Sequence, residues 1–356
     1  MARLTALERV TLSLIAVLAA LAGVANYQTW APVPRFAVAT LALAGLAWVV
    51  SFATEQLGER FGPAVTGMMQ STLGNLPELF VVVFALQKGE LVVAQTAIIG
   101  SIFANAMLVL GLVIVVGARR APDGIMRFSH RLPRDTATLL LVAVFIIVLL
   151  GLSLASHDPA SHHVKVISAV GAVSLLVVYL AWVVPYLRSD RLPGAEDDGS
   201  RHEPRLSLRL TLVLLFTAAI ASAFVSDWFV NALSPAIVQL NISQAFAGLV
   251  IVAIAGNAVE HTVGIVLAWK GRSDLAISVV KNSVAQIAAF LFPLLVLISF
   301  LLATTLTFAL APVYIGAFLV MALAMWQVTA DGEAAAFEGW ALVALYVILA
   351  TLTLYE

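Results

Sequence analysis

The chain has 356 residues, of which 62% are hydrophobic and only 11% are charged, and its formal net charge is -1. Its mean hydropathy of +1.03 excludes a water-soluble globular protein of this length. The absence of cysteine excludes disulfides, thiolate metal sites and cysteine nucleophiles. The high hydropathy predicts the lipid bilayer as a partner, and we expect no nucleic acid because the chain has no basic tail or arm.

Apolar segments follow one another along the whole chain, and a spanning helix needs about 20 mostly apolar residues. We therefore predict an all-α polytopic membrane protein with about 11 transmembrane helices. The first segment follows two arginines as a signal peptide would, but it lacks a small-residue cleavage site and is interpreted as a retained helix. The predicted spans are residues 10–27, 34–54, 63–87, 91–118, 135–155, 164–187, 207–228, 242–269, 275–299, 303–327 and 338–355.

The distribution of basic residues predicts how the chain is oriented, because Lys and Arg accumulate in short cytoplasmic loops. With the N-terminus inside, 15 of the 19 Lys and Arg residues fall in inside loops, three fall outside (Arg35, Lys88 and Lys165) and Lys281 falls within a span. We therefore expect a cytoplasmic N-terminus and a C-terminus on the opposite side of a plasma or inner membrane.

One long hydrophilic segment divides the chain into halves. Residues 188–206 contain Glu196, Asp197 and Asp198 together with Pro and Gly, a composition typical of a solvated linker. The predicted organisation is an extra transmembrane helix at 1–30, a first five-helix repeat at 31–187, a cytoplasmic acidic linker at 188–206 and a second five-helix repeat at 207–356.

The halves repeat each other at an offset of 182 residues, and the agreement includes Gly, Asn, Glu and Lys positions. Five spans separate the equivalent helices, so the second copy should cross the membrane in the opposite direction. Inverted repeats of this kind place substrate sites on interrupted helices. The matching pairs are Gly74 and Gly256, Asn75 and Asn257, Glu78 and Glu260, Lys88 and Lys270, Gly89 and Gly271, and Ser101 and Ser283.

Each repeat carries Gly-Asn-x-x-Glu inside an apolar segment, where an ionised carboxylate is costly and indicates function. Asn and Glu three residues apart would be neighbours on one helix face. Pro77 predicts a helix interruption at residues 74–77 that frees backbone carbonyls. Such oxygen ligands suit a hard cation, calcium above all. Two carboxylates neutralise a divalent ion and can take up protons when it leaves.

The successive motifs of the chain resemble those of the cation/proton exchangers of the calcium/cation antiporter superfamily. The resemblance implies that Glu78 and Glu260 bind calcium alternately with protons, that Asn75 and Asn257 help to coordinate it, and that proton influx drives calcium export. The motifs are Thr54-Glu55-Gln56-Leu57, Gly62-Pro63, Gly74-Asn75-x-x-Glu78, Gly100-Ser101-x-x-x-Asn105, Gly256-Asn257-x-x-Glu260-His261 and Ser283-x-x-Gln286-Ile287.

The predicted ion site is larger than the two glutamates, and several members have a structural alternative. Its members are Glu78, Glu260, Asn75, Asn257, Gly74, Gly256, Ser101, Ser283, Asn105 and Gln286. The serines and amides outside the Gly-Asn-x-x-Glu motifs could equally serve close helix packing. His261 joins the two glutamates in the predicted proton-coupling set, with a hydrogen bond to a neighbouring helix as its alternative.

Three positions depart from the family pattern. Leu76-Pro77 replaces small residues, Asn282 stands in place of glycine, and Lys281 introduces a cation. Lys281 has two interpretations: it lies beside the pore, where it would repel calcium or replace a proton or sodium ion in the cycle, or it points outward and snorkels.

The predicted function is calcium/proton antiport by alternating access, with calcium as transported substrate and no cofactor. A sodium-coupled calcium exchanger of the same superfamily is the nearest alternative, and a passive cation channel is more distant. An enzyme is not expected, since the chain lacks both His-Glu-x-x-His and Gly-x-Ser-x-Gly. A homo-oligomer is compatible with the sequence.

Overall fold

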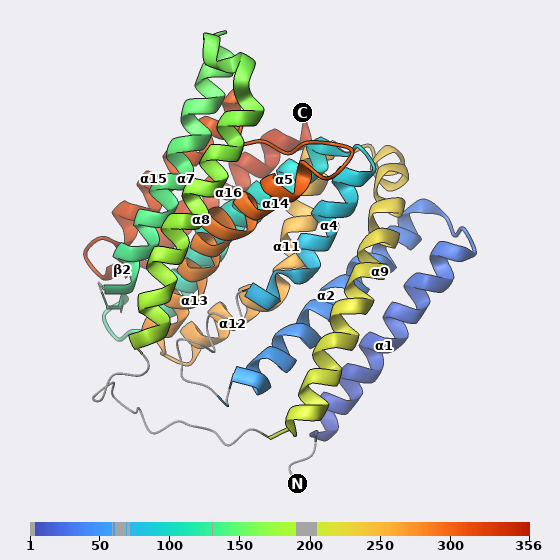
Figure 1. The fold of residues 1–356 in the computed structure, drawn as a ribbon. Helices are drawn as coiled ribbons and strands as arrows, with labels where there is room; N and C mark the ends of the chain where they lie inside the picture. Colours follow the sequence, from blue (N-terminus) through green and yellow to red (C-terminus); the bar gives the residue numbers. More distant parts are fainter. Residues whose placement is uncertain (1–3, 59, 61–68, 70–71, 130, 190–204) are drawn as a thin grey trace. The chain divides into compact units, whose positions relative to one another are not determined.

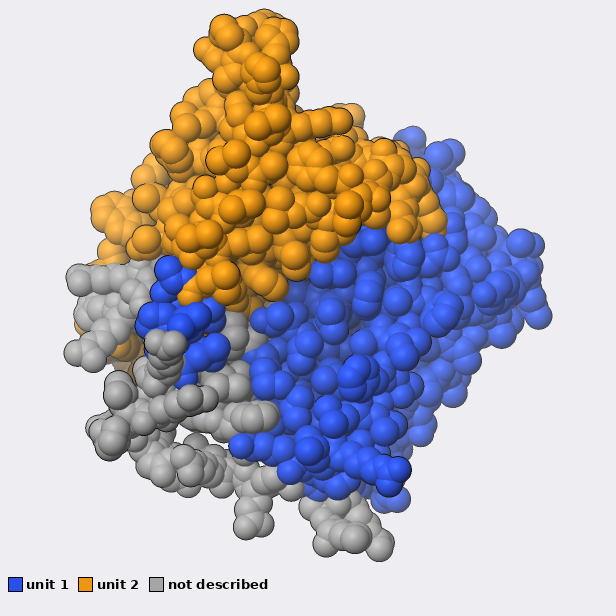
Figure 2. Space-filling model, in the orientation of Figure 1, with its two compact units in different colours: residues 1–84, 181–242, 255–259 blue, residues 85–180, 243–254, 260–356 orange. Residues whose placement is uncertain are grey.

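The structure is a computed structural model that describes residues 4–58, 60, 69, 72–129, 131–189 and 205–356 (Figure 1). The chain forms two compact units, coloured separately in Figure 2. Unit 1 comprises Met1–Phe84, Ala181–Ile242 and Ala255–Val259, and unit 2 comprises Ala85–Leu180, Ser243–Ile254 and Glu260–Glu356. Most of the predicted linker lies outside the described residues.

Unit 1 is built on three long helices, α1 (Ala6–Tyr27), α2 (Pro32–Gly58) and α9 (Leu208–Leu240). All three pack on one another, as Figure 1 shows. A capping box of Thr5 and Glu8 starts α1, because the threonine hydroxyl and the glutamate carboxylate each bond a backbone N–H that lacks a helical partner.

The helix α9 is longer than predicted. Its expected end at residue 228 is wrong, because the helix continues through Asp227, Asn231 and Pro235 to Leu240. Pro235 has no N–H for the carbonyl of Asn231 four residues earlier. Arg35 of α2 donates to that carbonyl at 3.2 Å. An arginine therefore supplies the hydrogen bond that proline removes.

Unit 2 contains the remaining long helices, several of them continued by a π-helical segment. A contact between two glycines brings the backbones of two of these helices, α6 (Leu110–Arg120) and α16 (Ala336–Leu354), close together. A Cβ added at Gly111 or at Gly339 would lie 2.5 Å from the carbonyl oxygen of the other glycine. The elements are α5 (Leu91–Phe103), η1 (Ala104–Val109), α6 (Leu110–Arg120), α7 (Arg131–Ala155), η2 (Pro159–His163), α8 (Val164–Ser189, whose end belongs to unit 1), α10 (Gln244–Phe246), η3 (Ala247–Val252), α13 (Ser273–Gln286), η4 (Ile287–Leu291), α14 (Phe292–Ser299), α15 (Pro312–Thr329) and α16 (Ala336–Leu354).

The all-α membrane class is confirmed, and the count of spans is partly tested. Within the described residues, nine helices are long and apolar enough to cross a membrane, and a bent helix pair makes ten if it forms one span. The predicted span 63–87 falls partly on residues outside the described ranges, and its described part contains a shorter apolar helix, Leu76–Gln87. Eleven spans therefore remain a prediction.

The predicted start of the tenth span at residue 303 is wrong, because α15 begins at Pro312. The apolar chain before it is not helical, and side-chain hydroxyls bond part of its backbone. The Ser299 hydroxyl accepts from the Leu306 amide at 2.9 Å, and the Ser168 hydroxyl accepts from the Phe308 amide at 3.2 Å. Hydropathy alone does not distinguish this segment from a helix.

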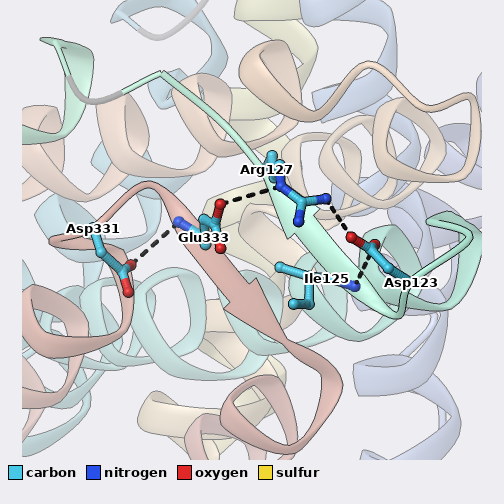
Figure 3. A network of polar contacts seen from close by, with 5 residues as sticks. All are labelled: Asp123, Ile125, Arg127, Asp331 and Glu333. Atoms are coloured by element: carbon cyan, nitrogen blue, oxygen red, sulfur yellow. Dashed lines mark hydrogen bonds and ion pairs between the residues drawn. The ribbon is translucent and has the colours of Figure 1, made fainter.

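A two-stranded ribbon in unit 2 was not predicted. Strand β1 (Ile125–Arg127) pairs antiparallel with β2 (Glu333–Ala335), with Arg127 opposite Glu333. Figure 3 shows the Arg127 guanidinium between two carboxylates, 2.6 Å from Asp123 and 3.1 Å from Glu333. The hydrogen bond from Arg127 holds the pKa of Asp123 below its ordinary value. The ribbon joins the chain after α6 to the chain after α15.

The glycine contact between α6 and α16 predicts a position-specific loss of stability. Gly339→Ala would place a methyl group against the Gly111 carbonyl, and such overpacking costs about 1–3 kcal/mol. Gly316→Ala in α15 is the matched control, since nothing lies within 4 Å of its added Cβ. In thermal unfolding in detergent, we expect a lower Tm for the first variant and an unchanged or higher Tm for the second. Equal Tm values would contradict this packing.

Candidate ion-binding site

The two Gly-Asn-x-x-Glu motifs each interrupt a helix at the asparagine. Asn75 is a turn residue between helical Gly74 and α4 (Leu76–Gln87). Asn257 is likewise a turn residue between α11 (Ala253–Gly256) and α12 (Ala258–Trp269), and the helices on its two sides are bent by 61°. The predicted interruption at residues 74–77 is confirmed, and the second motif shares it.

The break explains how Pro77 fits beside the glutamate. The Asn75 carbonyl accepts from the Leu79 amide at 2.9 Å, so Asn75 caps α4 and Pro77 is the second residue of the helix. At that position the missing N–H has no helical partner to lose. Asn75 and Glu78 thus lie at the start of one helix, as the cap and a residue of its first turn.

Both glutamates lie in the first turn of a helix that starts within an apolar segment: Glu78 in α4 and Glu260 in α12. The unpaired N–H groups at a helix N-terminus carry partial positive charge, which favours a carboxylate there. The local fold thus provides part of the compensation that a carboxylate needs away from water.

Unit 1 brings parts of the two motifs together. The Glu78 side chain is 1% exposed, and its Cβ lies 3.7 Å from the position of a Cβ at Gly256. Asn75 and Asn257 are also buried in this unit. The Ser226 hydroxyl of α9 donates to the Pro77 carbonyl at 3.4 Å. The Glu78 side chain therefore lies in van der Waals range of the end of α11.

Unit 2 brings Ser283 to Glu260. The Ser283 hydroxyl of α13 donates to the Glu260 carboxylate, and the serine is buried. His261 is also buried, and its Nε2 finds no hydrogen-bond partner among the described residues. This absence weighs against the interpretation that His261 bonds a neighbouring helix through Nε2.

Ser101, Asn105 and Gln286 are buried, Asn105 within the π-helical segment η1 and the other two shortly before η1 and η4. The Asn105 amide nitrogen donates to the Ser101 carbonyl at 3.0 Å within its own helix, so this bond does not join two helices. Its Oδ1 is buried and has no hydrogen-bond partner in the described part of the chain. The Asn105 Oδ1 atom is therefore available as a ligand or as a hydrogen-bond acceptor.

The element boundaries repeat at the same offset as the motifs. Adding 182 to the limits of α4 (Leu76–Gln87) gives those of α12 (Ala258–Trp269), and α5 and α13 begin at equivalent residues. The π-helical segments η1 and η4 also correspond, apart from their first residue. Gly89 and Gly271 occupy the turns between these helices with φ of +80° and +75°. The repeat therefore extends from residue types to backbone conformation.

Lys281 points into unit 2. Its side chain is 2% exposed, and Nζ donates to the Thr329 hydroxyl of α15 at 2.6 Å. The alternative in which it points outward and snorkels is wrong. The sequence gives no signal for Thr329 as its partner, because 48 residues separate the two.

The described residues contain no group of three or more His, Asp or Glu side chains placed to hold a metal ion. An ion bound beside one of the glutamates would need amide, hydroxyl or backbone oxygens in addition. Such mixed oxygen ligands are typical of calcium, whereas zinc sites rely on His, Cys and carboxylates.

These features define a polytopic membrane protein with two related helix breaks, each followed by a buried or partly buried glutamate. Residues 32–185 and 210–355 match the family described as sodium/calcium exchanger protein, and the chain belongs to this family.

Similar proteins span nearly the whole chain. It is 32% identical to the vacuolar calcium ion transporter of Schizosaccharomyces pombe, over 92% of this chain and 80% of that protein. It is 29% identical to the Ca(2+)/H(+) antiporter ChaA of Bacillus subtilis, over 97% and 98% of the two chains. The solved structure of native YfkE superposes with a TM-score of 0.81 at 27% identity, covering 97% of this chain and all of the other.

The contact between Ser283 and Glu260 predicts an energetic role for one hydroxyl. Ser283→Ala would remove a donor from a partly buried carboxylate, which costs about 1–3 kcal/mol. Ser278→Ala on the same helix is the control, because that hydroxyl accepts only a long bond of 3.4 Å from Asn282. Chemical unfolding in detergent should show the loss for the first variant alone. Equal effects of both variants would contradict the role given to Ser283.

Proposed function

We propose that the chain is a secondary active antiporter that exchanges calcium for protons across a membrane by alternating access. The observation that carries the proposal is a glutamate in the first turn of a helix that starts at an intramembrane break, present once in each repeat. The similarity to ChaA of Bacillus subtilis and to YfkE, both described as Ca2+/H+ antiporters, supports calcium and protons as the exchanged ions.

Calcium is the cargo that suits the groups at the breaks. A helix that ends at a break directs carbonyl oxygens toward a cation, and the helix that begins there holds the glutamate. In unit 1 these are the end of α11 at Gly256 and Glu78 of α4. We assign Glu78, Asn75 and Gly74 from the first motif, and Glu260, Asn257 and Gly256 from the second, to the calcium site.

Protons replace calcium because a bare carboxylate in a low-dielectric setting is unfavourable. When the ion leaves, each glutamate is neutralised by one proton, so the same groups carry either cargo. Ser283 keeps the Glu260 carboxylate oriented through its hydroxyl. We assign supporting roles to Ser101, Asn105, Gln286 and His261, of which His261 would assist proton transfer.

The proposed organisation is an extra N-terminal helix followed by two inverted five-helix repeats, with the N-terminus in the cytoplasm. The excess of Lys and Arg in alternate loops supports this orientation. The repeated limits of α4 and α12 support the division into repeats. The chain would act as a transporter with no chemical step and no resident cofactor.

Replacing either glutamate tests the assignment. We expect Glu78→Gln and Glu260→Gln to reduce proton-driven calcium transport in vesicles by at least about 100-fold, since an amide supplies neither the charge nor the proton. Asp158→Asn is the matched control: Asp158 is exposed and caps η2, and asparagine can also cap. Transport by either glutamine variant at the wild-type rate, with normal insertion, would contradict the assignment.

The same vesicles separate the proposal from its alternatives. A proton gradient imposed at zero membrane voltage should drive calcium against its own gradient, which a passive channel cannot do. Replacing the proton gradient by a sodium gradient should abolish uphill movement. If sodium drives calcium and protons do not, the chain is a sodium-coupled exchanger, the alternative that the family description keeps open.

A further inference from the structure

Lys281 is a buried cation with an unusual partner. Its Nζ donates to the hydroxyl of Thr329, the last residue of α15, and that hydroxyl donates its own proton to the Met325 carbonyl at 2.7 Å. The threonine oxygen therefore acts as acceptor for Lys281. No carboxylate in the described part of the chain forms an ion pair with this lysine.

The position of Thr329 explains how a lysine is accommodated without a carboxylate. The C-terminal end of a helix has unpaired carbonyls and partial negative charge. Lys281 lies on α13 and places its ammonium at that end of α15. The bond therefore joins α13 to α15 and compensates the charge at the same time.

A second contact holds the beginning of α13. The Asp274 carboxylate accepts from the Ser129 backbone amide at 2.6 Å. Ser129 lies two residues after β1, and Thr329 lies four residues before β2. Because β1 and β2 are paired, the two contacts and the ribbon form a closed loop, here called the α13 clamp: Asp274, Ser129, the β1–β2 ribbon, Thr329 and Lys281.

The clamp and the ion site use different sides of α13. Residues two apart in a helix point about 200° away from each other. Lys281 bonds α15, whereas Ser283 bonds Glu260 of α12. The clamp thus fixes the rotation and height of the helix that presents the Ser283 hydroxyl to the glutamate.

We propose that Lys281 is a positioning residue for calcium exchange, which acts through the α13 clamp to hold Ser283 at Glu260. This inference rests on the proposed function, because Glu260 must bind the transported ion for its orientation to matter. Lys281 itself neither binds calcium nor carries a transported proton. A residue that only stabilised the fold would leave the calcium KM unchanged.

Transport kinetics test the proposal. Lys281→Met and Thr329→Val should each raise the calcium KM roughly 3- to 10-fold, the size expected from one lost oriented hydrogen bond. The double variant should be no worse than the stronger single variant, since both remove the same contact. Thr329→Ser keeps the hydroxyl and should retain the wild-type KM. Wild-type KM values in both single variants, or additive effects in the double variant, would overturn the proposal.

A destabilised control excludes a general folding effect. Ser168→Ala removes a different buried hydroxyl of unit 2, the one that bonds the Phe308 amide. It should lower Tm and leave the calcium KM unchanged, measured at a temperature where every variant is folded. A KM rise equal to that of Lys281→Met would overturn the positioning role.

Hydrogen–deuterium exchange without calcium separates the two proposals. Lys281→Met should speed exchange in residues 273–286 and leave residues 208–240 unchanged. If the wild-type protein fails to exchange calcium for protons but this change is seen, the proposed function is wrong and the clamp stands. If transport is normal and exchange in residues 273–286 is unaffected, the clamp is wrong.

Discussion

The fold depends on placing a carboxylate inside an apolar segment without leaving its charge uncompensated. The chain does this by breaking a helix three residues before the glutamate, so that the free N–H groups in the first turn of a new helix lie beside it. Asparagine stands at both breaks and leaves the helical conformation readily, and at the first break Pro77 follows it, which has no N–H in need of an acceptor. The need to compensate the glutamate charge therefore explains why residues that interrupt a helix precede each glutamate.

Serine and threonine hydroxyls form several of the buried hydrogen bonds in both units. Ser226 bonds the backbone at the first break, Ser283 bonds the second glutamate, and Thr329 receives the buried lysine. Each adds a hydrogen bond without a new charge and with little volume, which suits helices packed in lipid. Substitutions at these positions would remove these hydrogen bonds with little change in the hydropathy of the segment.

The sequence was sufficient to predict the helical membrane class and the interruption at Gly74–Pro77, because carboxylates and Pro in apolar segments are rare and specific. The offset of 182 residues recurs in the limits of α4 and α12, whereas the two inverted five-helix repeats stay a prediction. It was insufficient for the end of α9, the start of α15 and the ribbon. These depend on partners distant in the chain, such as Arg35 at the Asn231 carbonyl and Ser299 at the Leu306 amide. The division of the ion ligands between Glu78 and Glu260 stays a prediction.

The π-helical segment η1 allows one long span to face two neighbours. Each residue of an α-helix turns by about 100°, so the extra residue of a π-turn re-aims everything that follows it. Before η1, Gly100 meets the backbone of Leu249, and after it, Gly111 meets that of Gly339. Shortening this segment by one residue would rotate the second half of the span and turn Gly111 away from α16. The length of the π-helical segment therefore determines which residues of the span pack against α16 in unit 2.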